Sequence, residues 1–97
     1  MIYNDNPVDN SAVTFPNWKK KITTITATYN NPTKYTPNRN VWVVKSNGSN
    51  FSVLVDGVSV GGVNNSTISI LVPVMKGQTI TVTSHANTQS VDVYAML

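Results

Sequence analysis

The sequence predicts an all-β domain, a small antiparallel β-sandwich or jelly roll of about seven or eight strands. The composition favours strands, because Val, Ile and Thr dominate the second half of the chain while Glu is absent and Leu and Ala are scarce. Short apolar stretches with a period of two recur along the chain, and clusters of Asn, Gly, Pro and Ser separate them. A chain of 97 residues has room for one domain with one modest core.

Residues 1–21 predict an irregular arm that precedes a sandwich domain of residues 22–97. Asn, Asp, Ser and Pro fill much of this segment, and its apolar residues are spaced too irregularly for a strand or a helix. Because such residues cannot form a core of their own, we expect the arm to dock on another protein. The predicted partner-binding residues of the arm are Tyr3, Val8, Val13, Phe15 and Trp18.

The first predicted strand spans residues 22–29, where apolar residues alternate with threonines. Residues 30–40 predict a loop, because two prolines and several asparagines cannot sustain a central ladder. Residues 41–45 predict the next strand, and Asn47-Gly48 predicts the turn that ends it.

The clearest local signal is a β-hairpin around Asp56-Gly57. This pair tolerates the positive φ that both central positions of a type I′ turn require. Residues 51–55 and 58–60, on either side of the turn, are rich in Val and read as its two strands.

Three further strands complete the predicted sandwich, at residues 67–74, 79–83 and 90–97. Pro73 has no N–H group to donate to a ladder, so its strand is expected at a sheet edge or a bulge.

The last predicted strand carries apolar residues on both of its faces. A strand with one solvated face would alternate apolar and polar residues, so we expect this strand to contact other copies of the chain. The predicted interface residues of a homotrimer are Val91, Val93, Tyr94, Met96 and Leu97.

Three segments within residues 36–97 carry a resemblance to a known class of domain. They are residues 41–44, the hairpin at 51–58, and residues 72–82, where Val-Pro-Val, a basic residue and Gly lead into alternating Thr, Ile and Val. These segments resemble the small trimeric β-sandwich head domains of bacteriophage fibres and other virion surface proteins, which are similar to the jelly roll of the tumour necrosis factor and C1q type. The resemblance implies a homotrimer around a threefold axis, exposed on a phage particle and without catalytic activity. Because no fibre shaft precedes the matched residues, we expect a small accessory protein, such as a capsid decoration or head-fibre protein, and not a self-standing tail fibre.

The composition argues against catalysis and against a metal or cofactor. The chain has no Cys, and charged residues make up only 11% of it. The single histidine, His85, lacks the partners of a metal set, and Ser84 beside it is expected to point away from the imidazole. Asp5 and Asp9 lack the spacing of a calcium loop. We therefore expect no enzyme activity, no catalytic or metal-binding residues and no cofactor.

Other functions stay open at the level of the sequence. One is the receptor-binding tip of a tail fibre that contacts host glycans through Tyr35 and Trp42, and another is a free carbohydrate-binding module. Binding of single-stranded nucleic acid through Trp18 and the lysines after it is less favoured, since the formal net charge of +3 is small. The sequence shows no secretory signal and no apolar run that could span a bilayer, so we expect a protein made in the host cytoplasm that resides on the virion surface.

Overall fold

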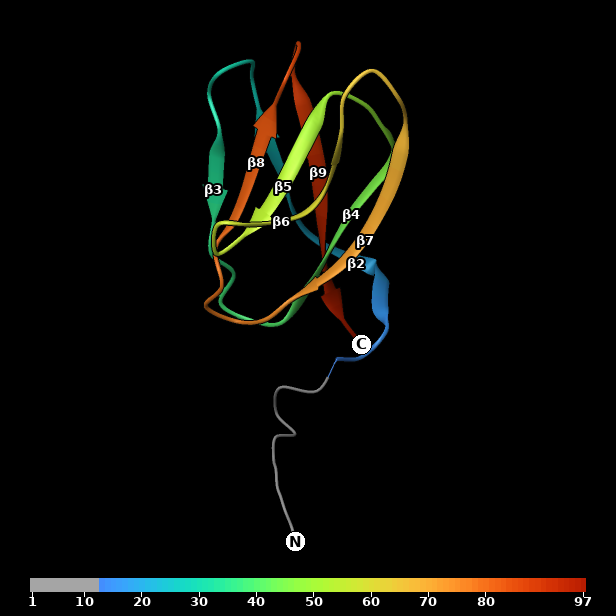
Figure 1. Ribbon diagram of the computed structural model, residues 1–97. Helices are drawn as coiled ribbons and strands as arrows, with labels where there is room; N and C mark the ends of the chain where they lie inside the picture. Colours follow the sequence, from blue (N-terminus) through green and yellow to red (C-terminus); the bar gives the residue numbers. More distant parts are fainter. Residues whose placement is uncertain (1–12) are drawn as a thin grey trace, which may run out of the picture.

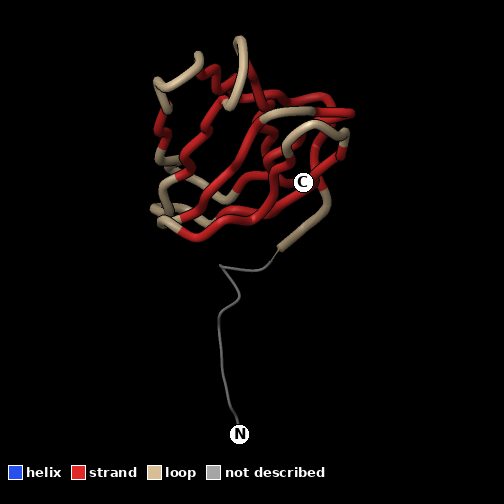
Figure 2. The backbone as a smooth tube through the Cα atoms, turned by 45° about the horizontal axis from the view of Figure 1, so that its top comes forward, coloured by secondary structure: helices blue, strands red, loops and turns tan. Residues whose placement is uncertain are grey.

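The computed structural model describes residues 13–97, and every regular element in that range is a β-strand (Figure 1). Eight strands form two antiparallel sheets of four strands each, connected by loops and turns (Figure 2). The predicted all-β sandwich is therefore confirmed. The strands are β2 (Pro16–Ala27), β3 (Thr33–Tyr35), β4 (Val41–Gly48), β5 (Phe51–Val55), β6 (Val58–Val63), β7 (Ile68–Val74), β8 (Ile80–Ser84) and β9 (Gln89–Met96).

The strand order is that of a jelly roll. One sheet has the order β2-β9-β4-β7 and the other the order β3-β8-β5-β6. The strands pair as nested partners, β2 with β9, β3 with β8, β4 with β7 and β5 with β6. The chain is thus one long hairpin that is folded back on itself, which is the jelly-roll arrangement. Successive strands alternate between the two sheets except for β5 and β6, which form the central hairpin in one sheet.

The core lies between the two sheets and is built from inward-facing residues of strands in both sheets. Every second residue is buried in the first half of β4, at Val41 and Val43, and in β9 from Val91 to Ala95. Phe51 is the largest fully buried side chain. Full burial of a Val or Phe side chain contributes about 1.5–3 kcal/mol relative to leaving it exposed. This shared core fixes the relative position of the two sheets.

The first strand of the sandwich begins at Pro16, six residues before the predicted start at Ile22. The predicted boundary between arm and sandwich at residue 21 therefore falls inside β2. The reason is visible in the pairing of β2 with β9, which shifts register between Pro16 and Lys21 and again between Lys21 and Thr23. A bulge adds an unpaired residue and breaks the period of two, so the hydrophobic pattern does not reveal this part of the strand.

β3 was predicted as part of a loop and is a strand of three residues. It lies at the edge of its sheet, between two prolines in the sequence, where no ladder on its outer side is required. Pro73 lies in β7, which forms the edge of the other sheet, as predicted from its missing N–H group.

The predicted type I′ hairpin joins β5 and β6. Asp56 has a φ of 49° and Gly57 a φ of 82°, so both central residues of the turn are left-handed. The side-chain Oδ1 of Asp56 also accepts a hydrogen bond of 2.9 Å from the backbone N–H of Thr79, which ties the hairpin to the loop before β8.

The loops gather at two opposite ends of the sandwich (Figure 1). We call one of them the terminal end, because the first described residues and Leu97 lie there. The other is called the distal end. The terminal end contains the loops of residues 36–40, 56–57 and 75–79, and the distal end contains those of residues 28–32, 49–50, 64–67 and 85–88.

Candidate interaction surface at the terminal end

The outer face of the β2-β9-β4-β7 sheet changes in character along its length. Toward the distal end, on β2 and β9, the Thr24 Oγ1 donates a hydrogen bond of 2.9 Å to the Asp92 carboxylate, and the hydroxyls of Thr26 and Ser90 lie 2.9 Å apart. Toward the terminal end, Tyr94 of β9 lies opposite Trp42 of β4. Residues directly opposite in an antiparallel pair share a face, so the two aromatic rings begin an apolar surface.

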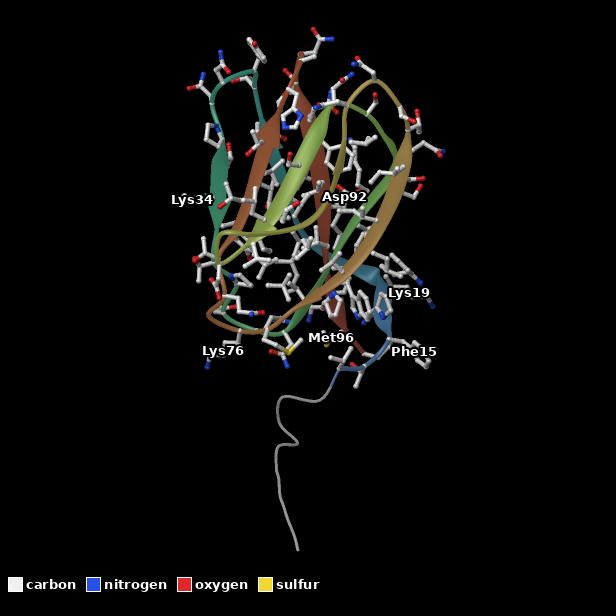
Figure 3. The ribbon with its side chains drawn as sticks, in the orientation of Figure 1. Phe15, Lys19, Lys34, Lys76, Asp92 and Met96 are labelled. Carbon is white, nitrogen blue, oxygen red and sulfur yellow. The ribbon has the colours of Figure 1, made fainter. Side chains whose placement is uncertain are left out.

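An apolar pocket of about 620 Å³ opens on this part of the sheet. Trp42 and Leu71 come from β4 and β7, while the other walls come from the segment before β2 and from the end of the chain after β9. Figure 3 shows Phe15 and Met96 in this region, with Lys19 above Phe15 on β2. The lining residues are Val13, Thr14, Phe15, Pro16, Trp42, Leu71 and Leu97. We call this set the terminal pocket.

The apolar side chains of the terminal pocket are unusually open to solvent. Phe15 is 77% exposed, Leu97 73% and Leu71 50%. Single exposed apolar residues are common, but a contiguous group of large ones marks a surface that another molecule covers.

Hydrogen bonds fix both ends of the described chain to the sheet beneath the terminal pocket. Trp42 Nε1 donates to the carbonyl of Thr14 at 2.7 Å, and the Thr14 hydroxyl donates to the carbonyl of Leu97 at 2.9 Å. The Leu97 N–H in turn donates to the carbonyl of Phe15 at 2.8 Å. These bonds hold the walls in place, so the terminal pocket is formed in the isolated chain.

Trp18 borders the terminal pocket on β2. Its ring meets Tyr94 edge to face, with centroids 5.1 Å apart and an interplanar angle of 71°. Such a pair contributes about 0.5–1.5 kcal/mol beyond burial. The Lys21 Nζ lies 3.7 Å from the Asp92 carboxylate on the adjacent strand, in a partly exposed ion pair. Trp18 is thus a strand residue and not part of an irregular arm.

The five predicted arm residues have different positions. Val13 and Phe15 line the terminal pocket, and Trp18 stands beside it with 57% of its surface exposed. Tyr3 and Val8 lie outside the described residues.

The predicted trimer interface needs a correction. Val91 and Val93 point between the two sheets and are 1% and 0% exposed, so the folded chain does not present them to a neighbour. The alternation of β9 places Tyr94 and Met96 on the outer face, and Leu97 is exposed at the terminal pocket. Only these last three remain candidates, because the apolar pattern on one face of β9 serves the core of the chain itself.

The structure does not bring together the two predicted glycan contacts. Tyr35 belongs to β3 and packs against the core, whereas Trp42 belongs to β4 in the other sheet and forms a wall of the terminal pocket. Tyr35 and Trp42 therefore do not share one face of a sheet.

His85 lies in a hydrogen-bonded cluster at the distal end that the sequence did not predict. Its Nε2 is 2.7 Å from the Ser52 hydroxyl, and its Nδ1 contacts the Asn64 side-chain oxygen. The hydroxyl of the neighbouring Ser84 points elsewhere and donates to the Ala86 carbonyl at 2.7 Å, which matches the expectation that Ser84 and His85 diverge. Ser52 lies in β5, between its partner strands, and is paired with Gly62 of β6 and Thr83 of β8. The backbone at Ser52 is therefore part of the sheet. We assign this cluster a structural role, because it joins the loops of residues 64–67 and 85–88 to strand β5.

No group of three His, Cys, Asp or Glu side chains that could hold a metal ion occurs among residues 13–97. Asp5 and Asp9 lie outside the described residues. Lys19, Lys20 and Lys21 are consecutive on β2, whereas Lys34 lies on β3 and Lys76 in the loop before β8 (Figure 3). The lysines that follow Trp18 are therefore on another element than Lys34 and Lys76.

The described part of the chain contains no helix with the length and hydropathy needed to cross a bilayer. Comparisons of the chain with protein families, with curated protein sequences and with solved structures find no match. The function is therefore proposed below from the sequence and the geometry of the chain itself.

Proposed function

We propose that the chain is a non-enzymatic structural protein of a bacteriophage particle, a homotrimeric accessory protein on the particle surface of the capsid-decoration or head-fibre type. Two observations support this assignment. Residues 36–97 resemble the trimeric head domains of virion surface proteins, and the strand order is that of a jelly roll, the architecture which that resemblance implies. The assignment to a phage rests on the resemblance alone.

The observation that carries the oligomeric part of the proposal is the exposed terminal pocket. Burial of apolar surface stabilises an association by about 25 cal/mol for each Å² removed from water. Phe15, Leu71 and Leu97 are each at least half exposed in the isolated chain, so they have this area to bury. A neighbouring copy that covers the outer face of the β2-β9-β4-β7 sheet would bury them together with Tyr94 and Met96.

A charge placed in the terminal pocket tests this interface. Leu71→Lys changes a side chain that is 50% exposed on edge strand β7, so the fold of the single chain should tolerate it. We expect the unmodified protein to run as a trimer in light scattering and the variant to run as a monomer, because a buried unpaired ammonium opposes association. The melting temperature of the unmodified protein should also rise with concentration.

Val58→Lys is the matched control. Val58 is 65% exposed and belongs to β6 in the opposite sheet, outside the proposed interface. The control should remain a trimer. A monomeric unmodified protein, or a Leu71→Lys variant that stays trimeric, contradicts the proposed interface.

A further inference from the structure

The four loops of the distal end share one chemical character, the absence of charged Lys, Arg, Asp and Glu side chains. None of the residues 28–32, 49–50, 64–67 and 85–88 is Lys, Arg, Asp or Glu. Asn, Ser and Thr make up most of these loops, and most of them are exposed. The distal end therefore presents amide and hydroxyl groups, which both donate and accept hydrogen bonds without carrying charge.

These loops are held to one another, so the surface they form is ordered. The His85 N–H donates to the Asn50 carbonyl at 2.8 Å, and the Asn65 N–H donates to the Asn50 Oδ1 at 3.1 Å. The His85 ring bridges Ser52 and Asn64. Three of the four loops thus meet through direct hydrogen bonds, and a ligand that binds across them would not have to order them first.

The fourth loop adds an exposed aromatic ring. Tyr29 follows β2 in a turn closed by a 2.9 Å hydrogen bond from the Asn31 N–H to the Thr28 carbonyl, and its backbone pairs with Ser84, next to His85. Its side chain is 58% exposed and lies between exposed polar neighbours. A tyrosine in such a position offers a flat apolar face beside a hydroxyl.

The chemistry of this surface selects among classes of ligand. A phosphate backbone or an anionic membrane requires several cations. These loops contain no Lys or Arg, and a single lysine, Lys45 of β4, reaches the Phe51 ring that follows the loop of residues 49–50. A protein partner is anchored chiefly by large buried apolar or Arg side chains, and Tyr29 is the one large side chain of that kind here. A neutral sugar carries hydroxyl groups around its ring and a patch of C–H groups on its face, and these match the amides and the tyrosine.

We propose that the distal end binds a neutral oligosaccharide, with Tyr29 stacking on one sugar ring and the loop asparagines contacting its hydroxyl groups. This site lies at the opposite end of the sandwich from the terminal pocket (Figure 1). The proposal goes beyond the structural role given above and does not depend on it, since the site is complete within one chain.

The test is a titration of the isotope-labelled full-length protein with three neutral tetrasaccharides, namely chitotetraose, cellotetraose and maltotetraose, followed by amide chemical shifts. We expect at least one of them to bind with a Kd of about 1 mM or tighter. The shifts should be confined to residues 28–32, 49–50, 64–67 and 85–88. Tetragalacturonate, which is anionic, should not bind.

Three variants assign the role of the tyrosine. Tyr29→Ala should weaken binding at least tenfold, whereas Tyr29→Phe, which keeps the ring, should retain most of the affinity. Val58→Ala removes an exposed apolar side chain at the other end and should have no effect. A well-dispersed spectrum of each variant would show that the variant is folded.

The proposal is overturned by an absence of shifts with all three tetrasaccharides, by shifts centred on the terminal pocket, or by unchanged affinity in Tyr29→Ala. Light scattering of the same samples reads the oligomeric state separately. Failure of sugar binding and failure of the trimer are therefore distinguishable.

Discussion

The two ends of the sandwich are built from the same set of strands and differ sharply in chemistry. Each of the three loops at the terminal end carries one charged residue, Arg39, Asp56 or Lys76, and the apolar terminal pocket lies at the same end. The four loops at the distal end carry no charge and are rich in amides. Because successive connections of a jelly roll fall at opposite ends, one chain can present two unrelated surfaces without a second domain.

The two ends also differ in the contacts that hold their segments together. At the terminal end, backbone bonds and the Trp42 side chain tie the first and last described residues to the sheet. At the distal end, a backbone bond from His85 to Asn50 is joined by side-chain bonds of Asn, Ser and His between loops. Because the contacts of the terminal end include the large ring of Trp42, that end should contribute more to global stability, and the distal end should be the more tolerant of substitution.

The largest effect is expected from Trp42→Ala. This change removes a half-buried ring and the 2.7 Å hydrogen bond from Nε1 to the Thr14 carbonyl. A large-to-small change of this kind costs about 2–4 kcal/mol, and we expect that loss in the free energy of unfolding measured by urea titration. Trp42→Phe, which keeps an aromatic ring and loses the bond, should cost less. Equal losses in the two variants would mean that the hydrogen bond, and not the ring, holds the terminal end.

A smaller effect is expected from His85→Ala at the distal end. The variant leaves Ser52 and Asn64 without their shared partner, but both can turn toward water because the cluster is only partly buried. Loss of such bonds costs about 1–2 kcal/mol. Urea titrations of His85→Ala and Trp42→Ala, carried out side by side, measure the difference between their free energies of unfolding. If His85→Ala is the more destabilising of the two, the ranking of the two ends is reversed.

The smallest effect on stability is expected from deletion of residues 1–12. The fragment 13–97 retains every contact described above, so its free energy of unfolding should lie within about 0.5 kcal/mol of that of the full chain. It loses Tyr3 and Val8, two of the predicted anchors. Co-sedimentation with particles that lack the protein should therefore fall for the fragment while its trimer persists in light scattering. Undiminished attachment would place the docking residues within 13–97.

Much of the fold is readable from the sequence because local signals and the core pattern agree. The hairpin is specified by Asp56-Gly57, and both residues adopt the positive φ that was expected. The edge position of β7 follows from Pro73. The early part of β2 is not readable, because bulges near Lys21 interrupt its alternation. A pattern with a period of two reveals a strand only where its register is continuous.

The surfaces are less predictable, since they depend on which segments the topology brings together. An apolar pattern on one face of β9 marks Val91 and Val93 equally well for the core or for an interface, and their burial in the core became clear only from the two sheets. The terminal pocket joins Val13 and Leu97, which are the first and last residues that the structure describes. The sequence of the distal loops did offer a signal, since it is uncharged and rich in Asn. That these loops lie at the same end of the sandwich could be known only from the strand order.

The nested pairing of the strands also sets an order for folding. The hairpin of β5 and β6 closes over a turn of two residues, whereas β2 and β9 pair residues as distant as Pro16 and Met96. Closing a longer loop costs more chain entropy, so the central hairpin should form early and the β2·β9 pair late, in a slow reaction dominated by contacts distant in sequence. The terminal pocket includes residues on both sides of that last pair. A chain arrested before this step lacks the surface through which we propose that copies associate, so assembly would select chains that have completed folding.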